Sequence, residues 1–264
     1  LSNIPKDKFL LIAGPCVIES DEIANQIAEK LVNITSKLSI PLIFKGSYKK
    51  ANRTKLDSFT GIGDIKALEI LKKINQEFKI PVITDIHEKN EAQIASEYVD
   101  VLQIPAFLAR QTELLVAAAK TGKTINIKKG QFMSPDSMEF AVNKVKEPGN
   151  DKIMITERGT SFGYNNLIND FKSLDIMKKY LYPVIFDATH SVQEPGGLGE
   201  ISGGKREFVT TLSKAAVAIG VAGIFIETHN DPDNAPSDGP NMLHIENLES
   251  LISKLNEFDT ISKK

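Results

Sequence analysis

Eight short apolar segments, each followed by a longer segment with helical periodicity, constrain the fold of this chain more than any other feature. The apolar segments are FLLIAG (9–14), PLIFKG (41–46), PVITDI (81–86), VLQIPA (101–106), TINIKK (124–129), IMITER (153–158), PVIFDA (183–188) and GIFIET (223–228). Short apolar runs between turn residues are typical of buried strands. Regular strand-helix alternation indicates parallel strands with right-handed crossovers. Eight such units without a long break predict one closed (β/α)8 (TIM) barrel, a single domain over residues 1–264.

The segments between the predicted strands carry apolar residues at helical spacing. One stripe consists of Ile23, Ile27, Leu31 and Ile34, and a second of Ile65, Leu68, Leu71 and Ile74. An open, doubly wound sheet is the alternative fold for such a pattern. No glycine-rich dinucleotide-binding motif follows the first strand, which disfavours that alternative.

The composition argues against several classes of function. A formal net charge of −2 over 264 residues indicates neither a nucleic acid nor an anionic membrane surface as partner. No run of about 18 apolar residues is present, so we expect no transmembrane helix. The first residues, LSNIPKDKF, lack the layout of a secretory signal, and the single cysteine cannot form an internal disulfide. We therefore expect a cytoplasmic protein.

Three irregular segments rich in Gly, Pro, Asn and Ser follow predicted strands, at 46–63, 190–204 and 229–243. In a (β/α)8 barrel, such segments form the C-terminal face, where active sites lie. Polar side chains also stand at the ends of the predicted strands: Cys16, Lys45, Asp85, His87, Gln103, Asn126, Lys128, Arg158, Asp187, His190, Glu227 and His229. Charged groups are rarely buried without partners, so this convergence predicts a functional site.

Several cations belong to this face: Lys45, Lys50, Arg53, Lys128 and Arg158. Ammonium and guanidinium groups bind phosphate and carboxylate through charge-assisted hydrogen bonds. Because the net charge is near zero, the cations indicate a local site for small anions. The loop residues Lys49, Lys50 and Lys55 fit solvated surface positions equally well. Lys128 and Arg158 end apolar strands, which favours the anion site.

A metal site is the second hypothesis for this face. The candidate ligands are Cys16, His190, Glu227 and one acid of the last loop, either Asp238 or Asp231. Thiolate, imidazole and carboxylate together suit Zn²⁺, Fe²⁺, Mn²⁺ or Co²⁺. The first, seventh and eighth strands are neighbours in a closed barrel, so these side chains should meet. A lone buried cysteine is more often an inert thiol, however, and no short metal-binding motif is present. His87, His229 and His244 remain alternative ligands.

Long motifs occur in one order along the whole chain. They are AGPCVIES (13–20), FKGSYKKANRT (44–54), TDIHE (84–88), LQIPAFLARQTELL (102–115), NIKKGQFMSP (126–135), ERGTSFGYNNL (157–167), FDATHSVQEPGG (186–197) and ETHNDPDNAPSDGP (227–240). On these motifs the chain resembles the 3-deoxy-D-manno-octulosonate 8-phosphate synthases. The resemblance implies a barrel, usually a homotetramer, that condenses phosphoenolpyruvate with D-arabinose 5-phosphate and water and releases phosphate. That reaction belongs to lipopolysaccharide precursor synthesis.

The same resemblance implies roles for individual residues. Positions that bind phosphoenolpyruvate are matched by Lys45, Lys50, Gln103, Ala106, Lys128 and Arg158. Positions that bind the pentose phosphate are matched by Asn52, Arg53, Thr54, Asp85 and Phe107. In the family, the arginine and hydroxyl residue of this set reach into a neighbouring subunit's site. Catalytic roles are implied for Lys50, Asp85 and His190.

The family that the chain resembles has a metal-dependent class and a metal-independent class. The first has a cysteine at the end of the first strand, and the second has an asparagine there. Cys16 matches the metal-dependent class. The resemblance then implies a divalent ion (Zn, Fe, Mn or Co) held by Cys16, His190, Glu227 and Asp238.

Two other functions are weighed against this one. The related 3-deoxy-D-arabino-heptulosonate 7-phosphate synthases use erythrose 4-phosphate and typically carry Lys-Pro-Arg-Thr where this chain has Ala51-Asn52-Arg53-Thr54. Asparagine offers a donor and an acceptor to a sugar hydroxyl, whereas proline offers neither, which favours the longer sugar. A barrel that binds sugar phosphates without catalysis is disfavoured, because none of the matched positions is lost.

Overall fold

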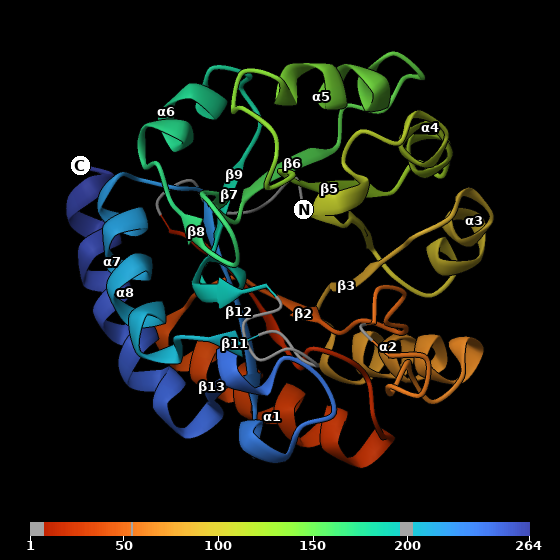
Figure 1. Cartoon of the computed structure of the whole chain (residues 1–264). Helices are drawn as coiled ribbons and strands as arrows, with labels where there is room; N and C mark the ends of the chain where they lie inside the picture. Colours follow the sequence, from red (N-terminus) through yellow and green to blue (C-terminus); the bar gives the residue numbers. More distant parts are fainter. Residues whose placement is uncertain (1–7, 54, 196–202) are drawn as a thin grey trace.

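The computed structural model describes residues 8–53, 55–195 and 203–264, and within them eight parallel strands close into a barrel (Figure 1). The barrel strands are β1 (Leu10–Gly14), β2 (Leu42–Lys45), β3 (Val82–Asp85), β4 (Val101–Ile104), β5 (Thr124–Lys128), β6 (Ile153–Glu157), β9 (Val184–Asp187) and β12 (Gly223–His229). Each strand pairs with the next one in this order, and pairing of β1 with β12 closes the ring. The predicted (β/α)8 barrel is confirmed, and the open sheet is wrong.

A helix follows each barrel strand and lies outside the ring (Figure 1). The helices are α1 (Asp21–Leu38), α2 (Asp64–Phe78), α3 (Lys89–Ser96), α4 (Thr112–Lys120), α5 (Met138–Lys146), α6 (Lys172–Lys178), α7 (Val209–Ala218) and α8 (Leu248–Ser262). Pro41, Pro81 and Pro183 each precede a strand, where the carbonyl oxygen accepts a ladder hydrogen bond and the missing N–H costs nothing. Within the described residues, every helix is too short or too polar to cross a membrane.

Strand side chains alternate between the inside of the barrel and the surrounding helices. The inner apolar cluster consists of Leu10, Ile12, Ile43, Ile83, Val101, Met154, Ile185 and Phe225. A larger apolar core lies between the strands and the helices and includes Ile27 and Leu31 of α1. Ile65, expected on the buried stripe of α2, is exposed at the second residue of that helix. Inward positions nearer the strand C-termini are buried but polar: Lys45, Asp85, Gln103, Asn126, Lys128, Thr156, Asp187 and Glu227.

Short elements in the loops complete the C-terminal face of the barrel. They are the hairpins β7 (Thr160–Ser161) with β8 (Leu167–Ile168) and β10 (Gln193–Glu194) with β11 (Gly203–Gly204), and β13 (Leu243–His244), which pairs with β12. The three loops expected to carry function all follow barrel strands, and their described residues lie on this face.

Gly14, at the end of β1, allows the backbones of β1 and β2 to approach closely. A methyl group placed on its Cα would lie 2.0 Å from the backbone carbonyl oxygen of Lys45. We expect Gly14→Ala to lower the free energy of unfolding by about 3 kcal/mol or more, because backbone atoms must move. Gly122→Ala is the control, since its methyl group meets no atom within 4 Å. That variant should lose only about 1–2 kcal/mol from its left-handed backbone. Equal denaturation curves for the two variants would contradict the prediction.

Candidate active site

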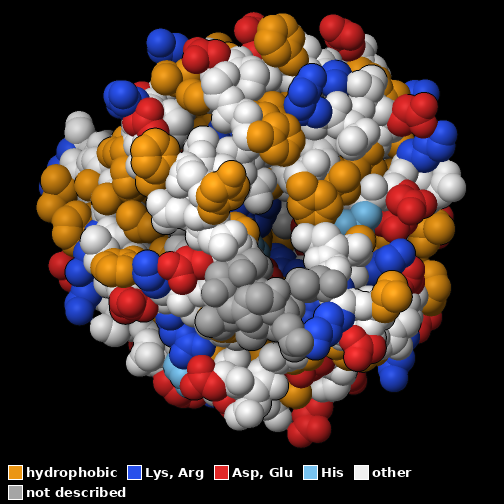
Figure 2. All heavy atoms as spheres, in the orientation of Figure 1, with side chains coloured by type: hydrophobic (Ala, Val, Ile, Leu, Met, Phe, Trp, Pro, Cys, Tyr) orange, Lys and Arg blue, Asp and Glu red, His pale blue; other side chains and the backbone are white. Residues whose placement is uncertain are grey.

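A pocket of about 330 Å³ opens at the C-terminal ends of the barrel strands. The face drawn in Figure 2 is hollowed near its centre, and Lys and Arg atoms are visible inside the hollow. Each of the three long loops contributes to the wall, with Arg53, His190 and Asp238 among the lining residues. The barrel thus gathers residues from distant parts of the sequence around one cavity.

Two buried lysines of the pocket are held by buried carboxylates. Lys45, at the end of β2, donates a hydrogen bond through Nζ to Glu227 Oε1 at 2.5 Å. Lys128, at the end of β5, donates to Asp187 Oδ2 at 2.6 Å, and its ammonium lies 3.9 Å from the centroid of the Phe225 ring. Because the carboxylates fix both ammonium groups inside the barrel, the lysines are preorganised for an anion.

Arg158 adds a third buried cation just after β6. Its Nη2 donates to Gln193 Oε1 at 2.8 Å, whereas its buried Nη1 has no hydrogen-bond partner among the described residues. Burial lowers the pKa of Arg158, because the guanidinium has lost the water that would solvate its charge. A buried guanidinium with a free N–H donor of this kind is suited to bind a phosphate or a carboxylate.

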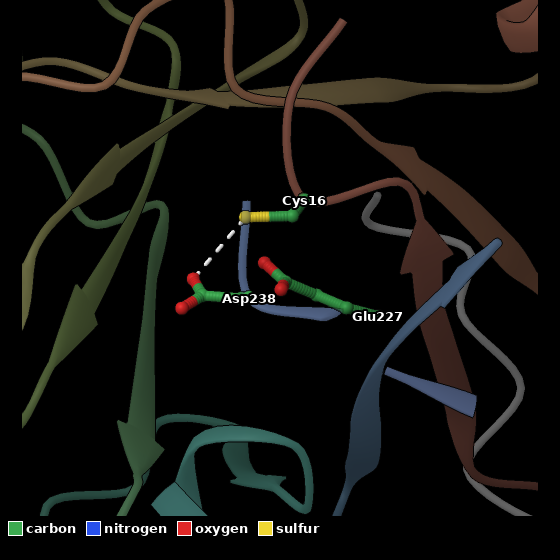
Figure 3. A group of neighbouring side chains, drawn as sticks. All are labelled: Cys16, Glu227 and Asp238. Atoms are coloured by element: carbon green, nitrogen blue, oxygen red, sulfur yellow. Dashed lines mark hydrogen bonds between the residues drawn. The ribbon is translucent and has the colours of Figure 1, made fainter. Parts of the chain in front are cut away.

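Cys16, Glu227 and Asp238 form a cluster beside the pocket, in which their ligand atoms all lie within 4.8 Å of one another. Figure 3 shows the three side chains pointing toward one another from the end of β1, from β12 and from the loop after β12. Cys16 Sγ donates to Asp238 Oδ2 at 3.2 Å. Glu227 Oε2 is buried and has no hydrogen-bond partner in the described part of the chain.

His190 lies at the edge of this cluster. Its Nε2 is 3.8 Å from Glu227 Oε1 and 3.9 Å from Asp238 Oδ2. Its Nδ1 is 2.8 Å from Asp187 Oδ2, and its backbone N–H donates to Asp187 Oδ1 at 2.9 Å. Asp187 therefore turns Nε2 toward the cluster, in the way that carboxylates orient metal-binding histidines.

The charges of the cluster suit a bound cation. Burial raises the pKa of the Cys16 thiol, and Glu227 raises it further. Burial also raises the pKa of Glu227, but Lys45 and then His190 lower it more, to a net value of about 2. Glu227 is therefore ionised at neutral pH while Cys16 keeps its proton. A divalent cation would stabilise the thiolate and the carboxylates, and thiolate, imidazole and carboxylate donors fit Zn²⁺, Fe²⁺, Mn²⁺ or Co²⁺.

Asp85 ends β3 and lines the pocket. Gln103 Nε2 donates to Asp85 Oδ1 at 2.6 Å, and Ser47 Oγ donates to Asp85 Oδ2. Burial raises the pKa of Asp85, but the pocket lysines, first among them Lys45, lower it more, so that it falls well below its usual range. The Asp85 carboxylate is therefore a hydrogen-bond acceptor at neutral pH and cannot serve as an acid there.

The other predicted substrate-binding residues lie around the same pocket. Those in its wall are Lys50, Asn52, Arg53, Ala106 and Phe107. Arg53 Nη1 donates to Ser237 Oγ at 2.7 Å, so it contacts the loop that carries Asp238. Thr54 lies outside the described residues. The expected reach of Arg53 and Thr54 into a neighbouring subunit concerns an assembly and stays a prediction.

Other candidate ligands lie apart from the cluster. His229 Nε2 is 2.6 Å from Glu19 Oε1, and His229 Nδ1 accepts the backbone N–H of Asp231 at 3.0 Å. His244 Nε2 is 3.8 Å from Asp233 Oδ2. His229 and Asp231 thus form a second group, which ties the loop after β12 to the loop after β1.

Sequence reasoning placed Asp187 among the polar strand ends but gave it no individual role, and it did not single out Gln131 or Gln193. Asp187 holds both His190 and Lys128, and the two glutamines line the pocket. Gln193 lies in a loop that the sequence already marked as functional, so it could have been a candidate. No local signal links Asp187 with Lys128, because that contact joins β9 to β5, and the two residues are 59 positions apart in the chain.

Comparison with known proteins agrees with the geometry. The sequence model of the DAHP synthetase I family matches residues 4–264. A Rickettsia canadensis protein named 2-dehydro-3-deoxyphosphooctonate aldolase is 55% identical over 256 residues, which cover 97% of this chain and 93% of that protein. Proteins with the same name from Bartonella quintana and Agrobacterium fabrum are 57% and 56% identical. These alignments cover 97% of this chain and 92% and 91% of the two relatives.

Proposed function

The chain belongs to the DAHP synthetase I family, and from that premise we propose that it condenses phosphoenolpyruvate with D-arabinose 5-phosphate and water. The products are 3-deoxy-D-manno-octulosonate 8-phosphate and phosphate, in the route to KDO and lipopolysaccharide. The observation that carries the proposal is the shared name of relatives aligned over 97% of this chain, 2-dehydro-3-deoxyphosphooctonate aldolase. The same alignments support an enzyme rather than a binding protein without activity.

The carbon skeleton in that name selects the sugar. An eight-carbon 2-keto-3-deoxy acid divides between its third and fourth carbons into a three-carbon pyruvate unit and a five-carbon aldehyde. Phosphoenolpyruvate supplies the first part, and arabinose 5-phosphate supplies the second. The heptulosonate alternative requires a four-carbon aldehyde, erythrose 4-phosphate, and is not favoured by the relatives' names.

Phosphoenolpyruvate is a small dianion or trianion, which fits the buried cations of the pocket. In the proposed complex, Lys45, Lys128 and Arg158 bind its phosphate and carboxylate, beside Gln103 and Ala106. The Nη1 of Arg158, which has no hydrogen-bond partner in the described part of the chain, supports this assignment most directly. Lys50 lines the same pocket and is proposed to act beside the reacting carbons.

The acceptor sugar is proposed to occupy the outer part of the pocket, against Asn52, Arg53, Thr54, Asp85 and Phe107. Arg53 is a suitable phosphate ligand, because its guanidinium offers a planar set of donors. Asp85 is anionic and therefore suited to accept a hydrogen bond from a sugar hydroxyl. The side chain of Phe107 is 40% exposed at the pocket mouth, which supports a lining role.

The proposed reaction forms one C–C bond and one C–O bond, the latter from water to C2, and it breaks the C–O bond between C2 and the phosphate. The water also supplies the proton that the aldehyde oxygen gains. Carbon C3 of phosphoenolpyruvate attacks the aldehyde carbon, and the aldehyde oxygen gains a proton. Water adds to C2, and the phosphate leaves with the electrons of the C2–O bond. Lys45, Lys128 and Arg158 stabilise charge on the departing phosphate. Asp85 and His190, both held by fixed hydrogen bonds, are proposed to orient the sugar and the attacking water.

We also propose that Cys16, His190, Glu227 and Asp238 hold a divalent metal ion, Zn, Fe, Mn or Co. Two observations support this assignment: Glu227 Oε2 is buried without a hydrogen-bond partner among the residues that the structure describes, and three acidic groups lie close together. When bound, such an ion supplies Lewis acidity for a substrate oxygen and lowers the pKa of a coordinated water. Asp187 keeps His190 in the tautomer whose Nε2 faces the site.

We further propose that the chain forms a single domain, that four copies assemble into a homotetramer, and that the protein is located in the cytoplasm. Exposed aromatic side chains in the loops after β4, β5 and β6 support contact with another subunit: Phe107, Phe132, Phe162 and Tyr164. Figure 2 shows hydrophobic side chains around the hollow on this face. A neighbouring subunit that covers them would lie close to the pocket mouth and could complete the site.

Phosphate release with different sugars tests the proposed function. The purified protein is incubated with phosphoenolpyruvate and either arabinose 5-phosphate, erythrose 4-phosphate or no sugar. We expect arabinose 5-phosphate to be preferred by about 100-fold or more, because a site that hydrogen-bonds a hydroxyl rejects an analogue without it. Mass spectrometry should identify the eight-carbon product. Faster release with erythrose 4-phosphate would favour the heptulosonate reaction, and release with neither would indicate a binding protein.

A further inference from the structure

A row of buried polar side chains crosses the inside of the barrel and converges on Asp85. Asp85, Gln103 and Asn126 are register partners on β3, β4 and β5, so they stand at one height inside the barrel. Asn126 Nδ2 donates to Gln103 Oε1 at 2.8 Å, and Gln103 Nε2 donates to Asp85 Oδ1 at 2.6 Å. Thr156 Oγ1 donates to Asn126 Oδ1 at 2.7 Å and ends the row on β6.

A second, shorter row reaches the other oxygen of Asp85. Ser47 Oγ donates to Asp85 Oδ2, and Lys50 Nζ donates to Ser47 Oγ at 3.0 Å. Every donor in the two rows points toward Asp85. The carboxylate cannot rotate without breaking bonds on both sides, so it is a fixed anchor for Ser47.

Ser47 is distinct from the residues that face the pocket. Its side chain is fully buried, and it is not among the residues of the pocket wall, whereas Lys50 is. Its backbone is held independently of the hydroxyl, because Ile18 N–H donates to the Ser47 carbonyl oxygen at 2.9 Å. The evident role of the hydroxyl is therefore to link the Lys50 ammonium to the Asp85 carboxylate through hydrogen bonds.

We propose that Ser47 is a positioning residue for the reaction, whose hydroxyl, anchored on Asp85, sets where the Lys50 ammonium lies in the pocket. This inference rests on the proposed function, in which Lys50 acts beside the reacting carbons. The four-bond stem of lysine is flexible, so an ammonium without a fixed acceptor samples several rotamers. Fixing it in advance lowers the cost of orienting it when substrate binds.

Ser47→Ala tests the proposal, because it removes one oxygen atom and keeps the backbone contacts. We expect kcat/KM for phosphoenolpyruvate to fall about 10- to 100-fold, the range for a lost hydrogen bond to a charged group. Ser213→Ala is the matched control, since Ser213 is equally buried and donates to a carbonyl oxygen in α7, away from the pocket. The control should retain activity within about twofold.

A double-mutant cycle separates positioning from a general structural role. If Ser47 acts through Lys50, then adding Ser47→Ala to Lys50→Met should change kcat/KM by less than about twofold. Ser47→Cys keeps the shape of the side chain but replaces the hydroxyl with a slightly larger thiol that hydrogen-bonds weakly, so its activity should fall by a factor similar to that of Ser47→Ala. Full activity of Ser47→Cys, or an undiminished effect of Ser47→Ala in the Lys50→Met protein, would overturn the proposal.

Thermal unfolding supplies a readout that needs no turnover. We compare the Tm shift of the double variant with the sum of the shifts of Ser47→Ala and Lys50→Met. The two values should differ by about 2 °C or more. Additive shifts would overturn the proposed contact. A parent protein that releases no phosphate with any sugar would instead refute the proposed function, and the unfolding cycle would still decide the contact between Ser47 and Lys50.

Discussion

Exhaustive chelation of the purified protein is expected to lower phosphate release by at least about 100-fold, and added Mn²⁺, Co²⁺ or Zn²⁺ should restore it. The reason is the charge of the cluster that Cys16 forms with Glu227 and Asp238. Without a cation, the buried thiol keeps its proton, and Glu227 Oε2 has no hydrogen-bond partner among the described residues. Metal content by mass spectrometry, followed in parallel with the activity assay, checks this expectation. Undiminished activity of a metal-free sample would refute metal dependence.

Two aspartates in the same loop provide a matched pair of variants. Asp238→Asn should lose most of its bound metal, because Asp238 lies within the cluster. Asp231→Asn should keep its metal, because Asp231 is exposed and contacts His229 and Asn234 instead. Changes at a metal ligand, or at a residue that orients one, commonly alter metal affinity or activity by about 10- to 100-fold or more, so the two variants should be readily distinguished. Equal metal content in both variants would show that Asp238 is not a ligand.

Cys16→Asn probes the thiol itself. Asparagine stands at this position in the metal-independent class of the family that the chain resembles, whereas Cys16 matches the metal-dependent class. The variant should therefore lose metal stimulation even if it keeps some turnover. Metal-stimulated activity in Cys16→Asn would show that the thiol is not a required ligand. Because Cys16 is the one cysteine of the chain, thiol titration of the unfolded variant confirms the substitution.

Arg158→Met is expected to lower kcat/KM for phosphoenolpyruvate by about 100- to 1,000-fold. The substitution removes a buried guanidinium that is proposed to pair with an anion of the substrate, and breaking such a pair costs about 2–5 kcal/mol. Arg158→Lys keeps the charge but loses the planar pair of donors, so it should recover only part of the loss. The KM for arabinose 5-phosphate should change far less, because that substrate is proposed to bind nearer the mouth. Steady-state kinetics with each substrate varied in turn measures the difference.

Lys152→Met is the control for this prediction. Lys152 immediately precedes β6, and Arg158 immediately follows it, so the two cations stand at opposite ends of one strand. The ammonium of Lys152 contacts the carbonyl oxygen of Gly122, far from the pocket wall. Its removal should leave kcat/KM within about twofold of the parent value. A similar loss in both variants would indicate a general effect of charge and not a bound anion at Arg158.

The strand order could be predicted because its signals are local. Each strand is a short apolar run, and each helix shows a stripe at helical spacing, as with Ile27 and Leu31 in α1. Because side chains alternate along a strand, Ile83 and Asp85 lie on the same side of β3, and this side faces the inside of the barrel. Ile65 was predicted to be buried but is exposed. The periodicity predicts which face of the helix is apolar, but it does not predict how much of that face the barrel covers.

The polar residues of the pocket were also anticipated, but their pairing was not. Lys45 and Lys128 both end strands, so their place at the pocket follows from the barrel. Nothing in the sequence indicates that Lys45 pairs with Glu227 or that Lys128 pairs with Asp187. Each of these contacts joins two strands that are far apart in the chain, and their distance depends on how the barrel closes.

The sequence alone determined how many barrel strands form, in what order, and which side chains alternate inward, because those properties follow from hydrophobicity and backbone geometry within a few residues. The resemblance already implied Asp238 as a ligand, but the residues alone left Asp238 and Asp231 open, and it is the tertiary structure that places Asp238 beside Cys16 and Glu227. The orientation of His190 by Asp187 and the link from Ser47 to Lys50 also depend on the tertiary structure. Such contacts depend on loop conformation and on packing across the barrel. They form only when the closed ring brings distant segments within hydrogen-bonding distance.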